Sequence, residues 1–186
     1  MRPSKVTNEE LIKNLATTIR QKGYDGASLS DLEKSSGLKK ASLYHRFPEG
    51  KQGIGLAVLQ DIGQTISERI LTIMIDKSIP TEERLPIVIE RIRELYDNGD
   101  LSCIINALSM QNGLDLFQND LNTTLENLIS NLTILGVDCG YSEKESNTKA
   151  IWALNAIQGS LILCRSMKNT KPFDEAMEFI KHLYKA

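Results

Sequence analysis

The sequence has no long hydrophobic run, and no stretch approaches the ~20 apolar residues needed to cross a bilayer. Its first residues, MRPSKVTNEEL, contain no apolar signal core, so we expect no export. The three cysteines, Cys103, Cys139 and Cys164, are far apart and match neither a disulfide framework nor a zinc-site spacing. With only two histidines as well, the sequence predicts no metal centre and no cofactor, in a protein of the reducing cytoplasm.

Catalytic motifs are also missing. The sequence has no Walker motif and no glycine pattern for dinucleotide binding. His45 could act as a base, but no Ser, Cys or carboxylate is arranged in sequence as its partner. We therefore predict no catalytic residue and expect that the protein is not an enzyme, although a helical enzyme stays open as an alternative.

Helical periodicity fills the chain, and sustained alternation of period two, which strands require, is absent. Composition is that of a globular protein, with 41% hydrophobic and 25% charged residues among 186. The longest apolar stripe has a spacing of four: Ile54, Val58, Ile62, Ile66, Ile70 and Met74. We predict an all-α fold of about nine helices, with one domain over residues 1–50 and a second over residues 51–186.

The first domain is predicted to hold three short helices. Thr7 and Ser28 are N-cap residues of the first two, Gly23 and Gly37 end them, and the third runs from about Lys39 to Phe47. Two short helices joined by a tight glycine turn are typical of the helix-turn-helix, whose second helix enters the DNA major groove. The core of this domain is predicted to consist of Leu15, Ile19, Tyr24, Leu32, Leu43 and Phe47.

The second domain reads as longer helices. We expect them over residues 51–74, 82–96, 101–110, 118–135, 142–167 and 172–184, with a loop at residues 111–113 and a connection at 136–141.

Charge divides the chain in the same way. The first 51 residues hold ten Lys and Arg against six Asp and Glu, a net charge of +4 within an overall charge of −2. The remaining residues therefore carry −6. A basic N-terminal segment on an acidic body favours a polyanion as partner of the first domain.

The segment from Ser28 to Lys51, with Gly37, Tyr44 and Phe47, resembles the operator-binding segment of the TetR family of transcriptional repressors. Its end, SLYHRFPEGK, is similar to the LmrA/YxaF-like branch of that family. The likeness continues at Leu101-Ser102-Cys103 and at Gln158-Gly159. It implies a DNA-binding helix-turn-helix domain and a helical domain that binds a ligand and a second subunit.

By position, the resemblance implies that the following residues contact operator DNA: Ser28, Lys39, Lys40, Ala41, Tyr44, His45, Arg46 and Lys51. Two residues depart from the family pattern. Lys39 stands where a serine N-cap is frequent, which removes a cap that stabilises by ~1 kcal/mol. Arg46 stands in place of a frequent histidine, and arginine can pair with two acceptors of a phosphate or a guanine.

An effector site is predicted in the second domain. Polar residues within apolar helices, and large adaptable side chains, indicate a ligand pocket. The candidates are Tyr96, Cys103, Asn106, Met110, Phe117, Trp152, Asn155 and Gln158. A helix core with satisfied amides is the alternative for each polar residue.

We therefore predict a repressor that is released from a palindromic operator by a small, largely apolar effector. Reading two half-sites requires a homodimer, which we expect to form through the last two helices. The alternative is a helical adaptor or small-molecule carrier that binds no DNA.

Overall fold

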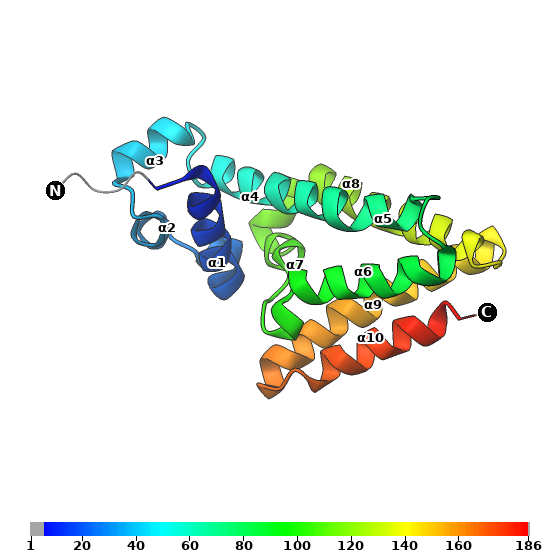
Figure 1. Cartoon of the computed structure of the whole chain (residues 1–186). Helices are drawn as coiled ribbons and strands as arrows, with labels where there is room; N and C mark the ends of the chain where they lie inside the picture. The colour runs from blue at the N-terminus through cyan, green and yellow to red at the C-terminus, as the bar shows by residue number, and fades with distance from the viewer. Residues whose placement is uncertain (1–5, 186) are drawn as a thin grey trace. The chain divides into compact units, whose positions relative to one another are not determined.

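A computed structural model describes residues 6–185, and within them every regular element is a helix (Figure 1). The elements are α1 (Asn8–Gly26), α2 (Leu29–Ser36), α3 (Lys40–Arg46), α4 (Lys51–Ile66), η1 (Ser67–Leu71), α5 (Thr72–Ile75), α6 (Thr81–Leu95), η2 (Asp97–Gly99), α7 (Ile104–Leu108), α8 (Gln111–Asp138), α9 (Glu143–Met167) and α10 (Lys171–Leu183). The helix α4, the π-helical turn η1 and the helix α5 follow one another without a break and form one continuous helix. The all-α prediction is confirmed.

The described chain forms two compact units. Unit 1 holds the residues up to Gly63 together with Ile104–Leu121, and unit 2 holds Gln64–Cys103 and the residues from Asn122 onward. The helices α4 and α8 each contribute residues to both units. The functional division at residue 50 stays a prediction, since unit 1 also includes most of α4, all of α7 and the first turns of α8.

Local sequence signals set the helix boundaries in unit 1. Thr7 and Ser28 each form a capping box, with Glu10 and Asp31 respectively, at the starts of α1 and α2. Gly37 ends α2 in the left-handed conformation, with φ of 68°. At Gly23, where we expected α1 to end, the helix kinks with φ of 73° and then continues to Gly26.

The predicted core of the three short helices is present, because all six of its side chains are buried. A seventh large side chain, Phe117 of α8, completes this core. Its ring meets the Tyr24 ring edge-on, with the centroids 5.0 Å apart. Gly55 of α4 packs against the Phe117 ring, since a Cβ atom on Gly55 would be only 2.5 Å from Phe117 Cζ.

The predicted loop at residues 111–113 is wrong, because these residues form the first turn of α8. Gly113 indicates close approach here rather than a loop, since a Cβ atom would lie 2.5 Å from the carbonyl oxygen of Leu108. The helix expected over residues 101–110 is also shorter than predicted, and α7 covers only Ile104–Leu108.

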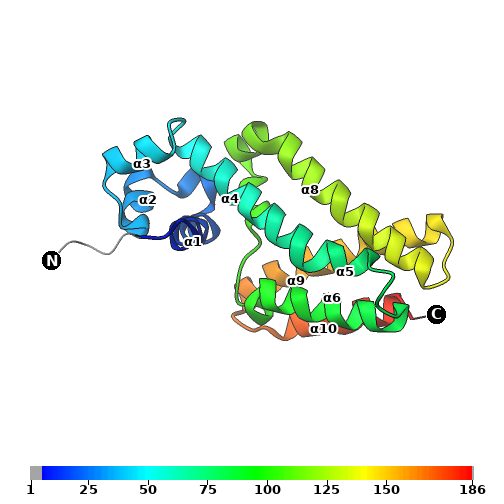
Figure 2. The same ribbon diagram turned by 45° about the horizontal axis from the view of Figure 1, so that its top comes forward.

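Unit 2 is organised around α9 and α10, which run side by side in both ribbon views (Figures 1 and 2). Ser142 forms the capping box of α9, as expected. The interface between the two helices is apolar, with Ala150, Ile157 and Leu161 of α9 and Phe173 and Met177 of α10 all buried. The predicted connection at 136–141 begins later, since α8 extends to Asp138 and brings Gly136 against Ser146.

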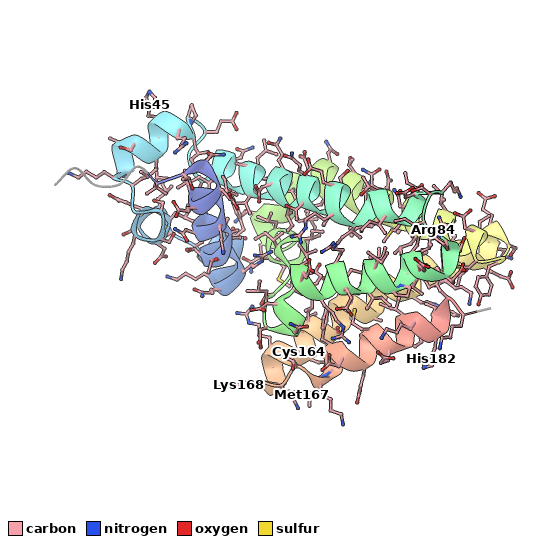
Figure 3. The ribbon with its side chains drawn as sticks, viewed as in Figure 1. His45, Arg84, Cys164, Met167, Lys168 and His182 are labelled. Carbon is pink, nitrogen blue, oxygen red and sulfur yellow. The ribbon has the colours of Figure 1, made fainter. Side chains whose placement is uncertain are left out.

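One buried cation fixes the start of α6. The Arg84 side chain, which is labelled in Figure 3, is 3% exposed. It donates to Asp138 Oδ2 at 2.7 Å, to the Met74 carbonyl at 3.0 Å and to Thr81 Oγ1 at 2.6 Å. Removing one partner of such a buried pair is strongly destabilising. None of the described helices combines the length and the apolar character that a membrane span needs.

Candidate nucleic-acid interface

The α2–turn–α3 segment of unit 1 is held by polar contacts at its start. Lys22 of α1 donates to Asp31 Oδ1 at 2.5 Å, and Ser28 Oγ donates to Asp31 Oδ2 at 2.6 Å. The hydrogen bond from Lys22, followed by those from Ser28, holds the pKa of Asp31 well below its usual range. The carboxylate is therefore ionised at neutral pH, and it ties α1 to α2.

The helix α3 has one buried face and one open face. Leu43 is 3% exposed and Phe47 is 8% exposed, and both pack into the core of unit 1. The other face is exposed and consists of Lys39, Lys40, Ala41, Ser42, Tyr44, His45 and Arg46. Figure 3 shows His45 pointing away from unit 1. The N-cap and six residues of α3 thus present cations, an aromatic ring and small side chains to solvent.

Tyr44 is the aromatic residue of this open face. Its ring lies 3.3 Å from the position that a Cβ atom of Gly50 would occupy, and Lys40 Nζ is 5.9 Å from the ring centroid. The tyrosine is 40% exposed, so part of its side chain is accessible to a ligand.

The two remaining residues predicted to contact DNA, Ser28 and Lys51, make hydrogen bonds within the protein. Ser28 is exposed, but its hydroxyl belongs to the capping box of α2. Lys51 is half-buried: its Nζ donates to the Asp25 carbonyl at 3.1 Å and lies 4.6 Å above the Tyr24 ring. Burial lowers the pKa of Lys51, and the nearby charge of Asp25 opposes that shift.

Two further contacts of unit 1 were not predicted from the sequence. The Asp25 carboxylate accepts a hydrogen bond from Asn112 Nδ2 at 2.7 Å, so the first turn of α8 is tied to the end of α1. The Glu33 carboxylate accepts from the backbone N–H of Lys40 at 3.0 Å, at the start of α3. No sequence motif links Asp25 to Asn112 or Glu33 to Lys40, so the sequence contains no signal that indicates these two hydrogen bonds.

Three of the predicted effector residues meet in unit 2. Tyr96 Oη and Gln158 Nε2 both donate to Cys103 Sγ at 3.5 Å, which brings together the end of α6, the segment before α7 and the middle of α9. Tyr96 also meets Phe173 of α10 edge-on, with the centroids 6.0 Å apart. The polar groups of these three residues thus lie among apolar side chains.

The other predicted effector residues do not join this group. Trp152 and Asn155 lie on the exposed side of α9, and Trp152 is 52% exposed. Asn106, Met110 and Phe117 fall in unit 1, where Phe117 is part of the core. Of the predicted effector residues, the structure thus brings together Tyr96, Cys103 and Gln158.

The exposed side of α9 and α10 is unusually apolar. The large hydrophobic side chains there are between 42% and 60% exposed: Ile151, Trp152, Ile162, Leu163 and Met167 on α9 and Phe179 on α10. Gly159 lies on the same side of α9, with no atom within 4 Å of the position of a Cβ. Exposed apolar patches of this kind mark interaction surfaces.

Metal-site geometry is absent from residues 6–185, where no three His, Cys, Asp or Glu side chains lie close enough to hold an ion.

Comparison with known proteins agrees with this geometry. Residues 11–58 match the sequence model of bacterial regulatory proteins of the tetR family. The HTH-type transcriptional regulator YxaF of Bacillus subtilis is 22% identical over 170 residues, which cover 89% of this chain and 88% of YxaF.

Solved structures share the whole fold. A TetR transcriptional regulator from Legionella pneumophila aligns with a TM-score of 0.81 at 22% identity, over 98% of each chain. The TetR family regulator CifR, as a cysteine mutant complexed with 26-bp double-stranded operator DNA, aligns with a TM-score of 0.73 at 17% identity, over 97% of this chain and 98% of CifR. At these identities the structures establish the fold, and the match of residues 11–58 covers the helix-turn-helix. Residues 11–58 therefore match the DNA-binding segment of the tetR family, and the chain shares the fold of solved TetR transcriptional regulators.

Proposed function

We propose that the protein is a homodimeric repressor that binds a palindromic operator and is released from it by a small, largely apolar effector. The observation that supports this best is the open face of α3, where Lys39, Lys40 and Arg46 are exposed while Leu43 and Phe47 anchor the helix. Such a regulator acts in the cytoplasm, where the bacterial chromosome lies.

Each exposed group on α3 has chemistry suited to DNA. Lysines neutralise phosphates, and an arginine at the position of Arg46 can bind a phosphate or pair with guanine O6 and N7. The small side chain of Ala41 allows the helix to approach the groove closely. Tyr44 offers a hydroxyl to phosphate or a ring face to a thymine methyl group, and His45 stands exposed beside it.

Dimerisation would cover the apolar face of α9 and α10. Two copies related by a twofold axis bury the same patch on each other, and such an interface would cover the exposed apolar side chains of Trp152, Ile162 and Phe179. Gly159 lets two α9 helices approach closely. The two copies of α3 would then read two half-sites about one helical turn apart, at ~34–36 Å.

Effector binding is proposed at Tyr96, Cys103 and Gln158 of unit 2. A ligand there would compete for the Tyr96 hydroxyl and the Gln158 amide, which donate to the Cys103 sulfur. The apolar surroundings favour a largely apolar molecule. Release would follow if the ligand binds better to a conformation that does not fit the operator. A coupling of ~1–3 kcal/mol weakens DNA binding 5–150-fold.

Binding to random-sequence duplex DNA at increasing salt tests the proposal against the adaptor alternative. We expect affinity to fall steeply with salt, because each phosphate contact releases a counterion. As a matched control, the same titration with the Lys39→Gln/Lys40→Gln/Arg46→Gln variant should show weak binding at unchanged thermal stability, because these three side chains are exposed. A protein that binds no duplex even at low salt would be the adaptor.

A further inference from the structure

The helix α3 begins without a cap of its own. Thr7, Ser28 and Ser142 each accept a hydrogen bond from the third helical N–H at the starts of α1, α2 and α9. The N-cap of α3 is Lys39, whose side chain has no acceptor and makes no such bond. The helix proposed to read DNA therefore lacks the local device that defines where the neighbouring helices begin.

An acceptor from another helix instead bonds the first helical N–H of α3. Glu33 lies on α2, seven residues before Lys40, and its Oε1 accepts from the Lys40 backbone N–H at 3.0 Å. The intervening turn is also closed, because Ser36 Oγ donates to the Glu33 carbonyl at 2.9 Å and accepts from the Leu38 N–H at 3.2 Å. Gly37 provides the left-handed residue that lets the chain return.

We propose that Glu33 is a positioning residue for DNA recognition: its carboxylate caps the first N–H of α3, whose own N-cap residue has no acceptor, and fixes α3 against α2. This inference rests on the proposed function. A carboxylate is a strong acceptor for a backbone N–H, and a negative charge is favoured at the positive end of a helix. Because α2 is itself fixed to α1 by Lys22 and Asp31, the bond from Glu33 extends that fixed frame to α3.

The position of Glu33 has a consequence for specificity. Its negative charge lies beside Lys39 and Lys40, so it opposes binding to phosphates of any sequence. Base contacts, in contrast, depend on the register of α3 in the groove, which the bond from Glu33 maintains. Loss of this bond should therefore weaken binding to a preferred sequence while leaving binding to random duplex unchanged or tighter.

Four variants separate the cap from the charge. Glu33→Gln keeps a side-chain acceptor and removes the charge, whereas Glu33→Ala removes both. Lys39→Ser supplies a local N-cap, and the double variant Glu33→Ala/Lys39→Ser tests whether one cap replaces the other. Glu49→Ala is the matched control, because it removes one exposed carboxylate from the turn after α3. The probes are a duplex enriched by the wild type from a random pool and a random-sequence duplex.

The measured quantity is the ratio of the two affinities, in which effects of charge alone largely cancel. Glu33→Ala should lower this ratio about fivefold, which at 1.4 kcal/mol per tenfold corresponds to the ~1 kcal/mol that a lost N-cap costs. Glu33→Gln and Glu49→Ala should stay within about twofold of wild type, and Lys39→Ser should restore the ratio in the Glu33→Ala background, as coupled sites do. Amide exchange of Lys40, measured without DNA, should be slowed in the wild type and fast in Glu33→Ala.

An unchanged ratio in Glu33→Ala, or no recovery in the double variant, would overturn the inference while leaving the proposed function intact. Equal exchange rates for the Lys40 amide in the wild type and in Glu33→Ala would also overturn it. If the wild type binds no duplex at all, the proposed function fails and the positioning role fails with it.

Discussion

Lys40 and Lys51 provide the sharpest contrast between a lysine that is free to meet DNA and one that is held by the protein. Both lie in the basic N-terminal segment, and the family resemblance implies DNA contact for both. Lys40 is exposed on α3, whereas Lys51 Nζ donates to the Asp25 carbonyl and lies above the Tyr24 ring. Replacing each by methionine removes the charge and keeps most of the aliphatic side chain.

The salt dependence of DNA binding distinguishes the two variants. If Lys39, Lys40 and Arg46 each meet one phosphate, a dimer makes about six contacts, and the slope of log K against log salt is about −5.4. Affinity then falls on the order of 2,000-fold between about 50 and 200 mM salt. Lys40→Met removes two contacts per dimer, so its slope should be about −3.6 and its loss on the order of 150-fold.

Lys51→Met should keep the wild-type slope, because no phosphate contact is lost. It should instead lower the free energy of unfolding by about 1–2 kcal/mol, through loss of a charged hydrogen bond and a cation–π contact. Fluorescence anisotropy with a labelled duplex gives the slopes, and urea unfolding gives the stabilities. A slope that falls equally in both variants, with Lys51→Met fully stable, would refute this reasoning and make Lys51 a phosphate ligand.

Three more outcomes follow from the packing and the charges. Gly55→Ala should destabilise unit 1 by about 1–3 kcal/mol, because the new methyl group would meet Phe117, and thermal melts should show Gly26→Ala close to wild type. Ile162→Asp should convert the dimer to a monomer by sedimentation, with fluorescence of the single tryptophan shifted to longer wavelength; an unchanged mass would move the interface elsewhere. The folded-state pKa of Asp31 is depressed, so its stabilisation is full above the unfolded pKa of about 4 and is lost as pH falls below that value. Asp31→Asn should accordingly melt earlier than wild type at neutral pH, and this difference should shrink below about pH 4; a constant difference would contradict the assignment.

Local signals made much of the fold predictable. Thr7, Ser28 and Ser142 are followed three residues later by an acid, and each does begin a helix with a capping box. Gly37 ends α2 because the left-handed conformation costs glycine little. The open and buried faces of α3 also follow from the sequence, since Leu43 and Phe47 are its only large apolar residues apart from Tyr44.

The features that could not be predicted depend on contacts between distant residues. The sequence predicts a loop at the first turn of α8, because the contact that requires Gly113, with the Leu108 carbonyl oxygen, is not visible in the sequence. The sequence predicts Phe117 as an effector-site residue, whereas its ring packs on Tyr24, more than ninety positions earlier in the sequence. The bonds from Lys40 to Glu33 and from Lys51 to Asp25 likewise join residues whose proximity exists only in the folded unit.

Selection from a pool of random duplexes tests most directly whether the exposed face of α3, presented twice by a dimer, reads DNA. The wild-type protein should enrich a sequence with twofold symmetry, whose half-sites are centred about 10 bp apart or a multiple of that distance. The Tyr44→Ala variant should enrich it less, although it melts within about 1 kcal/mol of wild type because the residue is exposed. A pool that stays random after selection at low salt, or that yields a single unpaired half-site, would contradict the account.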